Sequence, residues 1–310
     1  MKPHPFRALA AFALLLATTA LSSARDPLAA GTGNTFTEGA NSIPYRLYKP
    51  DGYDALGSKF PLVIFLHGDG ERGTNNTAQV SAHFQGLLDT TQNGSFAAYL
   101  FAPQAPTGGQ TNQWTNISYP TGSYSNPTLS APAINLPLQL ALDFVDQFIA
   151  QNNVDPTRVY ITGLSMGGYG TYDAIARRPD LFAAAAPMSG GGNLGAVNTY
   201  TNIPIWDFHG DADPTVPVSG SRSTITAIQN GGGTLERYTE LAGQGHVIWD
   251  PIYNGATEAY DTNYTGTYGT DGSGTLYSWM FAQQKAVPEP TTAALLALGG
   301  ALTFKRRRRS

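Results

Sequence analysis

The amino-acid sequence predicts an α/β domain with a mostly parallel central sheet covered by helices on both faces. Short apolar runs that end at glycine or proline alternate with segments whose apolar residues recur at helical spacing. This alternation is typical of parallel strands joined by crossover helices. In addition, residues 61–68, PLVIFLHG, form a continuous apolar run, as expected for a strand buried on both faces of a sheet.

The elements follow one another along most of the chain. Strands are predicted at residues 42–50, 61–68, 97–104, 158–165, 182–190, 204–210 and 235–241. Helices are predicted at residues 79–89, 136–150, 166–178, 219–230 and 275–284. Ser219 or Ser221 is expected to cap the fourth helix. Residues 106–132 are rich in Gly, Asn, Ser, Thr and Tyr without periodicity, which predicts a long loop of the kind that often binds ligands.

Both ends of the chain have the composition of targeting signals. Residues 1–24 combine a basic start, an apolar run and a small-residue end, which predicts a secretory signal peptide cleaved after Ala24. Residues 286–310 contain VPEP, an apolar run at 291–304 and five consecutive basic residues. That run is shorter than the roughly 20 residues of an ordinary membrane span, and the basic residues would hold its end on the cytoplasmic side.

The order of parts in residues 286–310 resembles the PEP-CTERM tail that exosortases process in Gram-negative bacteria. The resemblance implies export across the inner membrane and transient membrane insertion through the tail. It also implies an exosortase-type processing enzyme as a partner. The processed protein would then be at the cell surface, in the extracellular matrix or secreted.

The remaining residues, 25–285, are expected to form one domain. The terminal segments contain seven of the 18 basic side chains but only one of the 22 acidic ones, so this domain has a net charge of about −10. An acidic domain without a basic cluster argues against nucleic acid as a partner. The chain has no cysteine, which excludes thiolate catalysis, disulfides and Cys-ligated zinc.

Residues Gly163 to Gly167, GLSMG, fit the pattern G-x-S-x-G around Ser165. The pattern alone is weak, and a structural strand-to-helix turn is the alternative interpretation. Here, however, it follows a predicted strand and opens a predicted helix, as a nucleophile elbow requires. Glycines are needed there because the serine occupies a strained turn in which neighbouring Cβ atoms would clash. Ser165 is therefore a candidate nucleophile.

A serine nucleophile needs a base, and histidine is the usual one near neutral pH. The G-x-S-x-G pattern is accompanied by the chain order serine, acid, histidine. Only His246, in a loop after the last predicted strand, has the required position downstream of the acid. The other histidines lie in the signal peptide, in a predicted helix or at strand ends in His-Gly pairs: His4, His83, His67 and His209.

The acid is expected in the loop after the strand at 204–210, where Asp211 and Asp213 compete; we favour Asp213. Its role would be to hold the imidazole tautomer and to stabilise the imidazolium. An oxyanion hole needs two backbone N–H groups. One is expected from Met166, which follows the nucleophile, and the other from Asp69 in the glycine-rich loop 66–73.

Several segments resemble the secreted phospholipase/carboxylesterase-like α/β-hydrolases over about residues 40–285. This family is related to polyhydroxybutyrate-depolymerase-like and feruloyl-type esterases, and some members are labelled predicted peptidases. The segments that carry the resemblance are PLVIFLHGDGERG, LFAPQAP, RVYITGLSMGGYGTYDAIARRPDLFAAAAPMSGG, PIWDFHGDADPTVPV and RYTELAGQGHVIWDPIY. The resemblance implies the α/β-hydrolase fold. The roles it implies are nucleophile for Ser165, acid for Asp213, base for His246, oxyanion donors for Asp69 and Met166, and pocket wall for Trp114 and Trp249.

The polar insert at 108–127 departs from the family and puts the family's substrates in doubt, because loops above the sheet set specificity. We expect an exported serine esterase that needs no metal or cofactor, with polysaccharide-linked esters or polyesters as candidate substrates. A serine peptidase with the same triad is the first alternative. A catalytically silent binding module is the second, although such a module should have lost a triad member.

Overall fold

A single mixed sheet forms the centre of the computed structural model, which describes residues 25–53, 57–92, 94–116, 134–255 and 274–286. The eight strands have the spatial order β1-β2-β4-β3-β5-β6-β7-β8. They are β1 (Thr32–Glu38), β2 (Asn41–Tyr48), β3 (Phe60–Leu66), β4 (Tyr99–Pro103), β5 (Val154–Leu164), β6 (Ala184–Met188), β7 (Ile205–Gly210) and β8 (Glu236–Leu241). β2 pairs antiparallel with β1 and β4, and the remaining pairs are parallel. The predicted mostly parallel sheet is confirmed.

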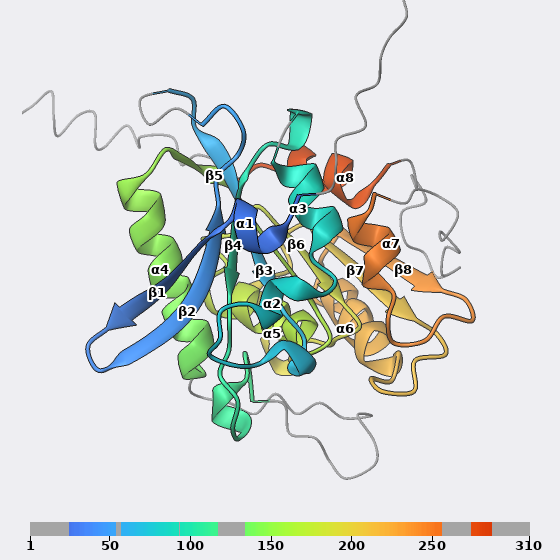
Figure 1. Ribbon diagram of the computed structural model, residues 1–310. Coiled ribbons are helices and arrows are strands. Elements are labelled where there is room, and N and C mark those ends of the chain that lie inside the picture. The colour runs from blue at the N-terminus through green and yellow to red at the C-terminus, as the bar shows by residue number, and fades with distance from the viewer. Residues whose placement is uncertain (1–24, 54–56, 93, 117–133, 256–273, 287–310) are drawn as a thin grey trace, which may run out of the picture.

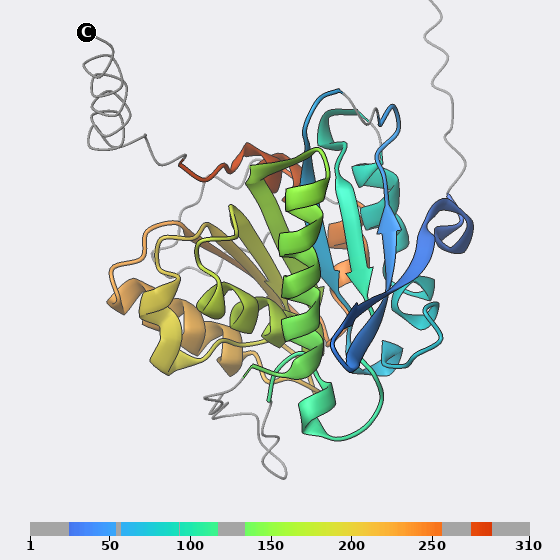
Figure 2. The same cartoon turned by 90° about the vertical axis from the view of Figure 1, so that its left-hand side faces the viewer.

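Helices cover both faces of this sheet (Figures 1 and 2). They are α1 (Pro27–Ala30), α2 (Ala78–Ser81), α3 (Gln85–Thr91), α4 (Leu136–Gln151), α5 (Met166–Arg177), α6 (Ser219–Asn230), α7 (Trp249–Tyr253) and α8 (Leu276–Ala282). α4, α5 and α6 pack on one face, whereas α3, α7 and α8 pack on the other. Burial of both faces explains why the strands at the centre of the sheet are apolar throughout.

The central strand β3 shows how one sheet supplies two hydrophobic cores. Leu62, Ile64 and Leu66 point into the core beneath α4 and α5. Val63 and Phe65 point into the core beneath α3 and α7. Successive side chains of a strand face opposite sides, so a strand between two helical layers needs apolar residues at every position. This geometry underlies the apolar run that predicted the strand.

Two predicted helical features are wrong in detail. The helix expected at 79–89 is divided into α2 and α3, and His83 between them has a φ of 57°. The ring of His83 contacts Asp250 instead, with Nδ1 2.7 Å from the carboxylate oxygen Oδ1. The N-cap of α6 is Val218, not Ser219 or Ser221.

The sequence did not predict β1 or α7. β1 is an edge strand with the sequence TGNTFTE, and almost all of its residues are exposed. An exposed edge strand has no apolar alternation to reveal it. α7 has five residues, which is too short for a helical period to be recognised.

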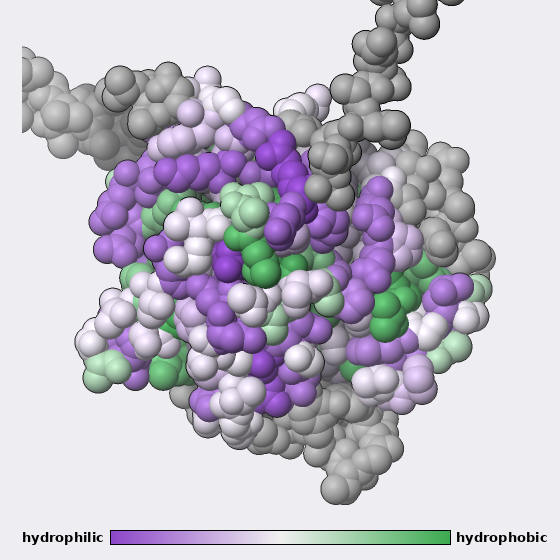
Figure 3. Space-filling view, in the orientation of Figure 1, coloured by the Kyte–Doolittle hydropathy of each residue, from purple (hydrophilic) through white to green (hydrophobic). Residues whose placement is uncertain are grey.

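The targeting signals fall mostly outside the part of the chain that the structure describes. The predicted signal peptide, residues 1–24, and the tail from residue 287 on lie outside the described residues. Residues 117–133 of the predicted long loop lie outside them as well. Among the described helices, none combines the length and apolarity that a membrane span requires. The face seen in Figure 3 is mostly hydrophilic, with small separate apolar areas, as the polar and weakly charged composition leads one to expect.

The carboxyl ends of the parallel strands lie at one edge of the sheet. Loops that follow β3, β5, β7 and β8 therefore meet there. In open α/β sheets this edge is where ligands bind. Each residue singled out from the sequence as nucleophile, acid, base or oxyanion donor lies in one of these four loops or at its border.

Candidate active site

The turn between β5 and α5 holds Ser165 in a strained conformation, with φ 54° and ψ −116°. Its N–H donates to the carbonyl of Met188 at the end of β6, at 2.9 Å. A Cβ placed on Gly167 would lie 1.9 Å from the carbonyl oxygen of Leu66, and one on Gly163 would lie 2.4 Å from the carbonyl oxygen of Gly167. Both glycines of the motif are thus required by close backbone contact. The turn has the geometry of a nucleophile elbow.

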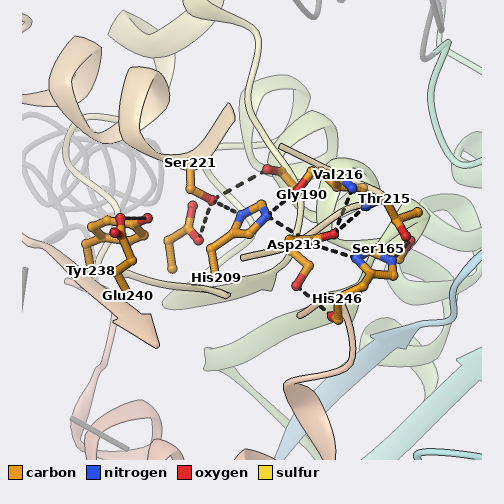
Figure 4. A network of polar contacts seen from close by, with 12 residues as sticks. Ser165, Gly190, His209, Asp213, Thr215, Val216, Ser221, Tyr238, Glu240 and His246 are labelled. Atoms are coloured by element: carbon orange, nitrogen blue, oxygen red, sulfur yellow. Dashed lines mark hydrogen bonds and ion pairs between the residues drawn. The ribbon is translucent and has the colours of Figure 1, made fainter. Parts of the chain in front are cut away.

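Three side chains from different loops form one hydrogen-bonded chain (Figure 4). His246 Nε2 lies 2.9 Å from Ser165 Oγ, and His246 Nδ1 lies 2.6 Å from Asp213 Oδ2. A carboxylate only accepts hydrogen bonds, so Nδ1 carries the proton and Nε2 is free to accept from the serine hydroxyl. This is the tautomer in which an imidazole can act as a base towards Ser165.

Asp213 is buried and held from several sides. Its Oδ1 accepts from the backbone N–H groups of Thr215 and Val216, at 2.8 and 2.9 Å. Burial acts to raise the pKa of this carboxyl, but hydrogen bonds from His209, His246 and the two amides outweigh it and hold the pKa well below its usual range. Asp213 is therefore an anion at neutral pH.

Asp211, the competing acid, lies elsewhere on the same turn. Its carboxylate accepts from the N–H of Gly243 at 2.6 Å and is exposed to solvent. It thus joins the loop after β7 to the loop after β8. Of the two candidates, the structure brings Asp213 to His246.

His67 organises the loop expected to form part of the oxyanion hole. It is buried, with Nδ1 2.6 Å from the carbonyl oxygen of Gly68 and Nε2 3.0 Å from the N–H of Ala105. Nδ1 is therefore the donor and Nε2 the acceptor. Burial lowers the pKa of His67 to about 4, so the ring is neutral near pH 7.

The hydrogen bond from His67 also orients the next peptide unit. No described peptide bond is cis, so the N–H of Asp69 points away from the Gly68 carbonyl and hence away from His67. A Cβ built on Gly68 would lie 3.6 Å from the Cβ of Ser165, so this peptide passes beside the serine. Met166 opens α5 on the other side, where the first helical N–H groups have no intrahelical acceptor.

Trp114 and Trp249 are both buried, at 0% and 3% exposure. Trp114 donates from its indole N–H to the carbonyl of His67 at 2.9 Å. Trp249 meets His246 edge to face, with ring centroids 5.2 Å apart. Each tryptophan thus packs against one histidine, Trp114 against His67 and Trp249 against His246. Direct contact of either tryptophan with a substrate stays a prediction.

Sequence reasoning missed a set of polar residues behind Asp213. His209, the residue before the last one of β7, lies 3.3 Å from Asp213 and contacts Ser221, and Ser221 contacts the buried carboxyl of Asp207. Ser189, in positive φ after β6, donates to the carbonyl of His246 at 3.1 Å. The signal that could have revealed the set is an aspartate inside the apolar strand PIWDFHG.

Within the described residues, no group of His, Asp and Glu side chains is placed to hold a metal ion.

Comparison with known proteins identifies the fold. The model of the prolyl oligopeptidase family matches residues 141–207, and the PEP-CTERM protein-sorting motif matches residues 286–309. A crystal structure of a thermostable esterase is 32% identical, with a TM-score of 0.66, and the alignment covers 84% of this chain and 64% of that one. The chain has the α/β-hydrolase fold, as its resemblance implied.

Two curated relatives are named as a depolymerase and as an esterase. Poly(3-hydroxyalkanoate) depolymerase C of Paucimonas lemoignei is 31% identical over 49% of this chain and 33% of the relative. The bifunctional acetylxylan esterase/xylanase XynS20E of Neocallimastix patriciarum is 29% identical over 54% of this chain and 21% of the relative. The chain spans a third or less of the length of these two proteins. The PEP-CTERM sorting motif implies export in Gram-negative bacteria.

The buried His67 predicts a measurable pH effect on stability. The unfolded chain binds this proton below about pH 6.5 and the folded chain only below about pH 4, so the contribution of His67 to stability falls as the pH drops through that window. Burial raises the pKa of Asp207 from 3.8 to about 6, which acts with the opposite sign in the same range. The wild type must therefore be compared with His67→Gln at each pH.

We expect the free energy of unfolding of the wild type to fall by about 3 kcal/mol relative to that of His67→Gln between pH 7 and pH 4. Urea unfolding followed by circular dichroism measures it. Between pH 7 and 8.5 the difference should stay constant, which serves as the control. A difference that does not change down to pH 4 would mean that His67 is not held neutral by burial.

Proposed function

We propose that this protein is an exported serine esterase that hydrolyses carboxylic esters through Ser165, His246 and Asp213. The observation that carries the proposal is the continuous hydrogen-bonded chain from the Asp213 carboxylate through both imidazole nitrogens to the Ser165 hydroxyl. The strained turn at Ser165 and the esterase relatives support the same conclusion.

The reaction begins when Ser165 Oγ attacks the ester carbonyl carbon and His246 Nε2 takes the hydroxyl proton. The carbonyl π electrons move to the oxygen, and the N–H groups of Asp69 and Met166 stabilise the resulting oxyanion. The tetrahedral intermediate then expels the alcohol, which receives the proton from His246, and an acyl-serine remains. Asp213 stabilises the imidazolium at each stage, because its carboxylate stays ionised.

Water completes the cycle. His246 Nε2 removes a proton from the water as its oxygen attacks the acyl carbon. The second tetrahedral intermediate then breaks its bond to Ser165 Oγ and releases the carboxylic acid, and His246 Nε2 returns the proton to Ser165 Oγ. Every proton movement is served by these three side chains. The proposed reaction thus needs no cofactor and no metal.

Esters are favoured over amides because an alkoxide leaves more easily than an amine and needs less assistance from the enzyme. The match to the prolyl oligopeptidase family model keeps a serine peptidase as the alternative. A silent binding module is less well supported, because all three polar residues are present and in hydrogen-bond contact.

For the substrate we propose a neutral, polymer-linked ester. One matched relative is named for a polyester and the other for acetylated xylan. The domain at 25–285 has a net charge of about −10, so anionic polymers would be repelled. Ester groups on a neutral polysaccharide or in a polyester avoid this repulsion.

We also propose that the tail directs the protein to an exosortase-type enzyme after transient membrane insertion. The last described residues are fastened at the amino edge of the sheet, where the N–H of Lys285 donates to the carbonyl of Thr157. Thr157 lies near the start of β5 and Ser165 directly follows its end, so they are at most about 26 Å apart at 3.3 Å per residue. Processing of the tail and hydrolysis of the ester would therefore take place at opposite ends of the domain.

We expect the protein to hydrolyse p-nitrophenyl acetate and butyrate and the variant Ser165→Ala to lose at least about 10⁴-fold in kcat, because no other group replaces the nucleophile. Release of p-nitrophenol measures the rate, and intact mass of a quenched reaction detects the acyl-serine. Ser223→Ala, on the exposed side of α6, is the control. Hydrolysis that survives in Ser165→Ala would refute the mechanism.

Replacing each competing aspartate by asparagine tests the acid. Asp213→Asn should lower kcat by about 10⁴-fold, since an amide in its place no longer selects the right imidazole tautomer. Asp211→Asn should keep kcat within about threefold, because an amide oxygen can still accept from Gly243. Steady-state kinetics on p-nitrophenyl butyrate compares them. The opposite ranking would assign the acid to Asp211.

Rates on acetylated xylan, feruloylated arabinoxylan and a short polyester test the substrate class. We expect the highest kcat/KM on a neutral carbohydrate-linked ester, in line with the aromatic and Asn-rich insert at 108–127. Introducing free carboxylates on the polymer should lower the rate, and added salt should restore it in part. Activity on the polyester alone would overturn the carbohydrate assignment and leave the esterase mechanism intact.

A further inference from the structure

Behind Asp213, a second line of polar side chains runs into the core of the protein (Figure 4). His209 is fully buried, and its two ring nitrogens have different neighbours. Nε2 lies 2.9 Å from the carbonyl oxygen of Val216 and 3.3 Å from Asp213 Oδ2. Nδ1 lies 2.8 Å from Ser221 Oγ. His209 is thus the link between the carboxylate that faces His246 and a serine that the proposed reaction does not use.

Ser221 continues the line to a buried carboxyl group. Its Oγ lies 2.8 Å from Asp207 Oδ1, and the other carboxyl oxygen of Asp207 accepts from the hydroxyl of Tyr172 at 2.6 Å. Asp207 and Ser221 are both fully buried. A buried carboxyl group inside an apolar strand is costly to ionise, so its hydrogen-bond partners decide its state.

Counting donors fixes how many protons the line holds. Val216 offers only a carbonyl oxygen, so Nε2 of His209 must carry a hydrogen. The two short contacts on either side of Ser221 Oγ each need one hydrogen, but the hydroxyl supplies only one. Asp207 as a carboxylate together with His209 as a neutral ring would leave one of these contacts without a donor in a buried site, which costs the full desolvation of a polar group.

One additional proton completes the line in either of two arrangements. If it is on Asp207, the carboxyl donates to Ser221 and Ser221 donates to a neutral His209. If it is on His209, the imidazolium donates to Ser221 and Ser221 donates to the Asp207 carboxylate. Atoms and charge balance in both, and the line as a whole is neutral. The raised pKa of Asp207, about 6 and due to burial, agrees with a carboxyl that resists ionisation.

We propose that Asp207, Ser221 and His209 form one positioning unit that retains a single shared proton and, through His209 Nε2, fixes Asp213 in the orientation that faces His246. The proposal rests on the proposed esterase function. Asp213 Oδ1 is fixed by two backbone amides, whereas Oδ2 meets only His246 and His209 in the contacts described above. The two amides fix only Oδ1 and would leave the carboxylate free to rotate about that oxygen. His209 thus sets the position of Oδ2.

The proton retained by this unit makes its effect depend on pH. Tyr172 and Tyr238 face Asp207 from α5 and β8, and Asp213 and Glu240 face His209 from the loop after β7 and from β8. A positive charge beside Tyr238 and Glu240 is supplied by Arg222 of α6, which pairs with Glu240. When the shared proton is lost as the pH rises, Ser221 can satisfy only one neighbour, and His209 is no longer held against Asp213. Loss of the proton should therefore reduce kcat on the high-pH side of the profile.

Three variants separate this role from simple packing. Asp207→Asn keeps a donor towards Ser221 and an acceptor for Tyr172, and so imitates the protonated arrangement without a titratable group. Ser221→Ala interrupts the line, and His209→Gln removes the second nitrogen. Ser223→Ala on the exposed side of α6 is the matched surface control. Thr91→Val is the control for loss of a buried hydroxyl, since Thr91 donates only within its own helix, to Leu87.

We expect Ser221→Ala and His209→Gln to lower kcat on p-nitrophenyl butyrate by about tenfold with KM changed less than twofold. Asp207→Asn should retain at least about a third of kcat and lose the fall on the high-pH side of the kcat–pH profile. Thr91→Val should lose thermal stability without loss of kcat. Wild-type kcat in folded Ser221→Ala and His209→Gln would overturn the positioning role. An Asp207→Asn variant as impaired as Ser221→Ala, or one with the wild-type high-pH limb, would overturn the shared proton.

A measurement without substrate keeps this test separate from that of the esterase. The proton between His246 Nδ1 and Asp213 should give a low-field ¹H NMR signal in the wild type and in Asp207→Asn. The signal should move upfield or vanish in Ser221→Ala and in His209→Gln, and stay in place in Thr91→Val and Ser223→Ala. An unchanged signal in all variants would refute the proposal whether or not the protein hydrolyses esters.

Discussion

The close contact between the start of α5 and the end of β3 is the constraint on which the rest of the site depends. The backbone at Gly167 lies so near the carbonyl of Leu66 that no Cβ fits between them. This contact forces the chain to turn sharply between β5 and α5, and the strain appears at Ser165 as a positive φ. In return, the serine is held at the carboxyl edge of the sheet beside the loop that follows β3. Position, orientation and neighbouring amides of the serine all follow from one steric requirement.

Around this rigid point the polar groups are ordered by burial. His67 is kept neutral because it is enclosed, and its tautomer is set by one acceptor and one donor of the backbone. Asp213 is kept ionised although it is enclosed, because two amides and two imidazoles donate to it. Burial thus leaves one of these groups neutral and the other charged. The number of hydrogen-bond donors around each group decides which charge state it has.

The sequence was sufficient for what depends on local pattern and chain order. Apolar runs and helical spacing predicted the sheet and its main helices. The motif around Ser165 set the expected chain order, elimination among the histidines selected His246, and Asp213 was favoured over Asp211. It was insufficient where a residue acts across the fold. The sequence does not reveal the contact of His209 with Ser221, because that contact exists only after α6 has packed against β7. His83, at the break between α2 and α3, likewise contacts Asp250, which lies far away in the chain.

β5 joins the two regions of the molecule that carry its chemistry. Thr157, near the start of this strand, holds the segment that leads to the sorting motif, and the end of the strand carries Ser165. Residues 160–163 of this strand are paired on both sides, with β3 and with β6, and cannot bend without breaking two sets of hydrogen bonds. This paired segment leads directly into the turn at Ser165 and so gives the serine a rigid base. The described chain thus ends near the amino edge of the sheet, where Lys285 meets Thr157, whereas the loops that hold Ser165, Asp213 and His246 lie at the carboxyl edge.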